Sequence, residues 1–92
     1  MQRGEEAFAK FEMWKNSKTD LKLTDVTKGE MPKILRGCIS SLDRESYLVG
    51  FAVTATRSFG ILNLRDASFR VGKCAVEAER EDDYLMFEEG AV

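Results

Sequence analysis

The chain has 92 residues and a formal net charge of −2, with 43% hydrophobic and 33% charged residues. We expect a single domain over residues 1–92 with one modest core, because this composition is typical of folded proteins and not of disordered ones. No apolar run approaches the roughly 20 residues that a membrane-spanning helix needs, and none follows the N-terminus as in a signal peptide, so we expect a cytoplasmic location.

The first predicted element is an amphipathic helix over residues 5–17. Apolar residues recur in it at spacings of four and three and form one stripe, which consists of Ala7, Phe8, Phe11 and Trp14. The helix carries more apolar surface than one small barrel must cover. Phe8, Met13 and Trp14 are therefore the candidate residues for binding a protein partner or a second copy.

Alternating apolar and polar residues follow and predict strands at 21–26, 33–42 and 46–55. Two further short segments bounded by turns predict strands at 59–64 and 68–71. A helix followed by five or more short strands predicts a mainly β fold, a small and strongly bent antiparallel barrel over about residues 20–72.

The C-terminal part is acidic, since residues 74–92 carry one arginine and seven acidic residues. We expect an extra hairpin over residues 74–88, with strands at 74–79 and 84–88. The segment 84–87 is apolar on both faces, so it is either a buried central strand or a pairing surface. The acidic residues themselves are expected to repel nucleic acid, to cover a basic face or to keep the protein in solution.

Residues 35–49 contain the pattern Gly-x-Ile-x-x-x-Asp, formed by Gly37, Ile39 and Asp43. A glycine inside a strand marks a sharp bend or the close approach of another backbone. This segment resembles the first motif of the Sm-like (LSm/Hfq-like) family of small β-barrels. The resemblance implies that the glycine bends the second strand and that the acidic residue opens the loop into the third. It also implies a homo-oligomeric ring, in which the fourth and fifth strands of neighbouring subunits pair, with RNA as ligand.

The chain departs from that family at several positions. The loop over residues 29–36 is longer than the usual step, and Leu64 stands where Hfq-like proteins carry an aromatic residue. The sequence contains no histidine, and Asp66 replaces the pore-lining one. A carboxylate beside a phosphate is repulsive, which argues against RNA at that rim.

Nucleic-acid binding needs basic side chains interleaved with aromatic ones on which bases stack. The candidates in and near the turns are Arg44, Tyr47, Arg57, Arg65 and Arg70. Phe59 stands beside Arg57 as a second aromatic candidate. The alternative is that Tyr47 and Phe59 are core or half-buried strand residues and that the arginines are simply solvated.

A cyclic-dinucleotide-binding barrel of the PilZ type is a further alternative. Asp66 and Ser68 begin its D-x-S-x-x-G motif, but Val71 occupies the glycine position and no R-x-x-x-R pair lies upstream. Paired arginines are the residues that would hold the phosphates of such a ligand.

We expect no catalytic residues, no metal and no cofactor. The absence of histidine removes the commonest general base and transition-metal ligand, and Cys38 and Cys74 lack the spacing of a metal motif and are expected to be buried thiols. The sequence therefore favours a non-enzymatic Sm-like barrel that acts through oligomerisation, with RNA as a candidate ligand. A protein–protein interaction or structural module without a nucleic-acid role ranks second, and the PilZ-like barrel third.

Overall fold

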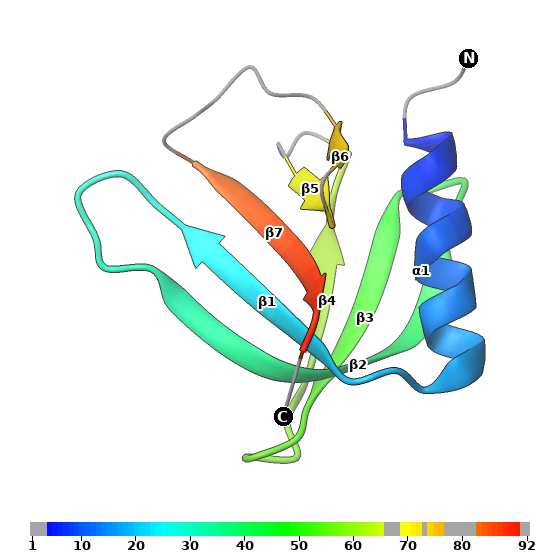
Figure 1. Cartoon of the computed structure of the whole chain (residues 1–92), viewed down its shortest axis with the longest axis horizontal. Coiled ribbons are helices and arrows are strands. Elements are labelled where there is room, and N and C mark those ends of the chain that lie inside the picture. The colour runs from blue at the N-terminus through cyan, green and yellow to red at the C-terminus, as the bar shows by residue number, and fades with distance from the viewer. Residues whose placement is uncertain (1–3, 66–68, 73, 77–82, 91–92) are drawn as a thin grey trace.

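The structure is a computed structural model that describes residues 4–65, 69–72, 74–76 and 83–90. One N-terminal helix is followed by strands of a single mixed sheet, which curls into a half-barrel (Figure 1). The elements are α1 (Glu5–Ser17), β1 (Leu21–Val26), β2 (Lys33–Asp43), β3 (Leu48–Val53), β4 (Phe59–Asn63), β5 (Phe69–Val71), β6 (Cys74–Val76) and β7 (Tyr84–Glu89). Their order across the sheet is β4-β3-β2-β1-β7-β5-β6, so β4 and β6 are the outermost strands among the described residues.

The N-terminal two thirds of the chain agree with the prediction. The helix over 5–17 and the strand over 21–26 have the expected bounds, and β2 to β5 agree to within about two residues. The strands β1 to β4 follow one another as antiparallel neighbours.

Two predictions for the C-terminal part are wrong. The sheet is mixed, because β5 pairs with β7 in parallel. Residues 74–88 do not form a separate hairpin, since β6 pairs with β5 while β7 lies between β1 and β5. Phe87 is fully buried and its neighbours Tyr84 and Met86 are partly covered. A strand with apolar residues on both faces leaves more apolar surface exposed to water at the edge of a sheet than in its centre. The central-strand alternative for this segment is therefore confirmed.

Gly37 lies where β2 changes partner. It pairs with Leu21 of β1 on one side and with Val53 of β3 on the other. A Cβ atom at this position would collide with the carbonyl group of Ala52, so only glycine allows the two strands to lie this close. A bulge between Ile39 and Ser41 follows directly, and bulges increase local twist. The expected close backbone approach at this glycine is confirmed.

The helix α1 packs its apolar stripe against one face of the curled sheet, which we call the core face. The Phe11 ring lies 4.8 Å from that of Phe87 in β7 and 6.2 Å from that of Phe69 in β5, measured between centroids. Because Phe11 is completely buried, truncating it to alanine would cost about 3–5 kcal/mol. The core comprises Ala7, Phe8, Phe11, Trp14, Leu21, Leu23, Ile39, Val49, Phe51, Leu64, Phe69, Val71 and Phe87.

The helix ends at Lys18, which adopts the left-handed conformation at φ 51°. Its backbone N–H donates to the carbonyl of Lys15, and that of Thr19 donates to the carbonyl of Trp14. These bonds satisfy carbonyl groups that the helix leaves unpaired and turn the chain directly into β1. Among the described residues the helix α1, with 13 residues, is too short to span a bilayer.

Candidate functional site

The three helix residues expected on a partner surface do not share one. Phe8 and Trp14 are buried in the core, whereas the side chain of Met13 is 47% exposed. The core of the half-barrel therefore buries two of the three side chains that were candidates for a partner surface. Of the three, only Met13 is available to a partner.

The turn between β2 and β3 brings two of the candidate arginines to one corner. The Asp43 carboxylate accepts the backbone N–H of Ser46 at 3.2 Å, which fixes the turn that the motif predicts. The Arg44 guanidinium lies 4.0 Å from the Glu5 carboxylate of α1. The Arg65 guanidinium donates to the carbonyl of Glu45 at 3.5 Å, so this side chain reaches the same turn from the end of β4.

Tyr47, the aromatic candidate at that corner, packs into the domain. Its ring lies 5.0 Å from that of Phe8, and its backbone is left-handed at φ 56°. It is half-buried against the core cluster, as in the alternative that the sequence left open, but it lies in the turn before β3 and not in the strand.

The remaining two arginines lie elsewhere. Arg57 is exposed in the turn between β3 and β4, at the other end of β3 from Arg44. Arg70 in β5 places its guanidinium carbon 5.0 Å from the centre of the Tyr84 ring in β7, a cation–π contact. The arginines and Tyr47 proposed for nucleic acid thus occupy three separate places. Phe59, close to Arg57 in sequence, is exposed and not half-buried as in the alternative.

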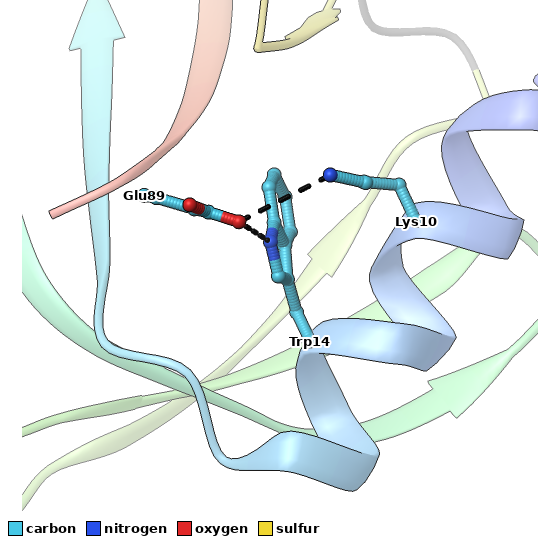
Figure 2. Close-up of polar contacts among 3 residues, drawn as sticks. All are labelled: Lys10, Trp14 and Glu89. Carbon is cyan, nitrogen blue, oxygen red and sulfur yellow. Dashed lines mark hydrogen bonds and ion pairs between the residues drawn. The ribbon is translucent and has the colours of Figure 1, made fainter.

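A cluster that the sequence did not predict joins α1 to the end of β7 (Figure 2). Glu89 accepts a hydrogen bond of 3.0 Å from the indole Nε1–H of Trp14, and its same oxygen lies 4.0 Å from Nζ of Lys10. The lysine Nζ is also 5.5 Å from the centre of the indole ring. Because a buried indole N–H needs an acceptor, Glu89 allows Trp14 to sit in the core. The sequence shows Glu89 as one of the acidic residues of the C-terminal part, and nothing local indicates that it lies beside Trp14.

The described residues carry no cluster of three or more His, Cys, Asp or Glu side chains that would hold a metal ion. The start of the PilZ-like motif at 66–68, and with it Asp66 at the expected pore position, falls outside the described residues. That the chain has no catalytic residues stays a prediction from the sequence.

The outermost strand β4 carries the clearest exposed apolar pair. Phe59 is 56% exposed and Ile61 is 62% exposed, and both project from the outer face of the sheet, opposite to the core face. The Phe59 ring lies over Gly50 of β3, where an added Cβ would come within 2.9 Å of it. The short apolar segment 59–64 predicted the strand but could not show that β4 ends the sheet.

A second exposed apolar group lies on the β1–β2 hairpin, which projects from the body of the domain (Figure 1). It consists of Met31, Ile34 and Leu35. The hairpin loop is bonded to the residue that precedes β7, since the Asp83 carboxylate accepts the backbone N–H of Lys28 at 3.0 Å.

No family model, no curated protein and no solved structure matches this chain.

Proposed function

We propose that this chain is a non-enzymatic β module of Sm-like type that acts through self-association, with β4 as the surface through which copies meet. The observation that carries the proposal is the position of β4. It ends the sheet, and it exposes Phe59 and Ile61 on one face.

Natural proteins usually protect an outermost strand with charged residues, with proline or with a covering segment. The sequence of β4 is Phe-Gly-Ile-Leu-Asn, which contains neither a charged residue nor a proline. An uncharged edge with two exposed apolar side chains is a surface that favours pairing with another strand.

The mode of assembly differs from the one that the family resemblance implies. There, the fourth strand of one subunit meets the fifth strand of the next. Here β5 has β7 on one side and β6 on the other, so its edges are already used. In the part of the chain that is described, β4 and β6 are the strands that have another strand on one side only.

Sedimentation velocity over a range of protein concentrations tests the proposal. We expect the wild-type chain to sediment faster as concentration rises, and Ile61→Lys to remain a monomer, because a lysine on the strand charges the pairing surface. Ile34→Lys is the matched control, since Ile34 is similarly exposed, at 53%, but lies on β2 away from the β4 edge. A wild-type chain that stays monomeric at every concentration would remove the proposal.

RNA binding is a second candidate, favoured by the meeting of Arg44 and Arg65 at the β2–β3 turn. We expect a labelled uridine- or adenine-rich oligomer to bind at low salt, and alanine at either arginine to weaken binding and to lower the slope of log affinity against log salt by about one. Arg57→Ala is the control, because Arg57 lies at the other end of β3. The absence of binding at low salt would exclude this candidate.

A further inference from the structure

The hydrogen-bond register of the β3–β4 pair identifies the backbone groups that face outward. The Val53 N–H donates to the carbonyl of Ser58, and the Leu64 N–H donates to the carbonyl of Tyr47, both at 2.8 Å. Hydrogen-bonded pairs alternate along an antiparallel ladder, so the intervening even-numbered residues of β4 also bond to β3. The N–H and C=O groups that point to the open edge therefore belong to Phe59, Ile61 and Asn63.

We infer that β4 pairs with β4 of a second copy of this chain, antiparallel and with a twofold axis at Ile61. This inference rests on the proposed function and names its partner and register. In the register, Ile61 lies opposite Ile61 of the second copy, and Phe59 lies opposite Asn63. It is the arrangement in which all three residues with outward-facing groups find partners on the other strand.

A twofold β4–β4 contact is favoured over a β4–β6 contact for two reasons. β6 has three residues and β4 has five, so a β4–β6 contact would leave part of β4 unpaired. Closed twofold dimers are also the commonest symmetric assemblies, whereas a head-to-tail contact makes a ring or an open filament. Because β4 carries no charge, two copies of it meet without repulsion along the strand.

The outer-face side chains set the strength of this contact. Phe59 and Ile61 each expose on the order of 100 Å² of apolar surface, and the twofold axis joins both pairs into one row. The apolar surface of these side chains from both copies together lies well below the roughly 1,200 Å² that a stable interface buries. We therefore expect a weak dimer, populated at high protein concentration.

Cysteine cross-linking tests the register. The background is the full chain with Cys38→Ser and Cys74→Ser, first shown by sedimentation to associate like the wild type. A hydrogen-bonded antiparallel pair has Cα atoms about 5.5 Å apart, which lies within the range that a disulfide spans. Ile61→Cys should therefore form a disulfide-linked dimer on mild oxidation. Leu62→Cys is the control and should not, because its side chain lies on the other face and opposite a different residue.

Two mixtures complete the experiment. Phe59→Cys mixed with Asn63→Cys should give a linked heterodimer, whereas each alone should link only weakly. Ile61→Cys mixed with Ala75→Cys reports a β4–β6 contact, since Ala75 is the central residue of β6.

The outcomes separate the register from the proposed function. Self-linking of Ile61→Cys, together with the Phe59–Asn63 heterodimer, supports the twofold contact. If the chain associates but only the Ile61–Ala75 mixture links, or none links, the twofold register is wrong and self-association stands. If the background and the wild type are both monomeric, both proposals are wrong.

Discussion

Gly37→Ala is the substitution that most directly tests the bend in β2. The added Cβ would collide with the carbonyl group of Ala52 and would lie 3.1 Å from a ring carbon of Phe51. The carbonyl belongs to the backbone of β3, which is held in the ladder, so the strands themselves must separate. The hydrogen bond of 2.9 Å from the Thr54 N–H to the Arg36 carbonyl lies beside this point and would be strained as well.

We expect the substitution to lower the free energy of unfolding by about 3 kcal/mol, the upper part of the range for overpacking in a core. In a domain of this size, each kcal/mol corresponds to about 4–8 °C in Tm. Thermal unfolding followed by circular dichroism, at a protein concentration low enough to keep the chain monomeric, should therefore show a fall in Tm of about 12–24 °C.

Gly60→Ala is the matched control. Gly60 also lies inside a strand, but a Cβ there would meet no atom within 4 Å. We expect this variant to be unchanged or stabilised by about 0.4–1 kcal/mol, because alanine restricts the unfolded chain. If Gly37→Ala and Gly60→Ala unfold at the same temperature, the close approach at Gly37 does not constrain the fold.

Two further predictions concern buried polar groups. Glu89→Ala removes the acceptor of the buried Trp14 indole and should cost about 1–3 kcal/mol in urea unfolding. Lys10→Ala removes a solvent-exposed ion pair and a cation–π contact with the Trp14 ring, which together should cost about 1 kcal/mol or less. Equal losses in the two variants would contradict the role given to the indole hydrogen bond. The hydroxyl of Thr24 is buried and has no hydrogen-bond partner among the described residues. Thr24→Val should therefore leave stability unchanged or raise it by up to about 1 kcal/mol, and a clear loss in a thermal melt would show that the hydroxyl is bonded.

The helix and the first strands were predictable because the sequence patterns that indicate them lie within each segment. The stripe spacing from Ala7 to Trp14 predicts a helix, and the alternation from Leu21 to Val26 predicts a strand, whatever each one packs against. Gly37 was identified for the same reason, since a glycine within an alternating strand usually marks a bend or a backbone that passes close by.

The order of the strands was not predictable, because it depends on contacts between distant segments. Tyr84 and Phe87 indicate a strand that is apolar on both faces. They do not indicate that β1 and β5 are the strands beside it. The joint exposure of Phe59 and Ile61 on β4 was not predictable for a related reason. Residues 59–64 are apolar on both faces, and only the sheet order shows that Phe59 and Ile61 lie on the outer face of an outermost strand.

Amide hydrogen exchange of β4, measured residue by residue by NMR at low and at high protein concentration, tests the central claim of self-association most directly. At low concentration we expect alternation, with slow exchange at Gly60 and Leu62 and fast exchange at Phe59, Ile61 and Asn63, because only the first two donate to β3. At high concentration the amides of Phe59, Ile61 and Asn63 should become protected. Exchange at those three amides that stays fast at every concentration would contradict pairing through β4.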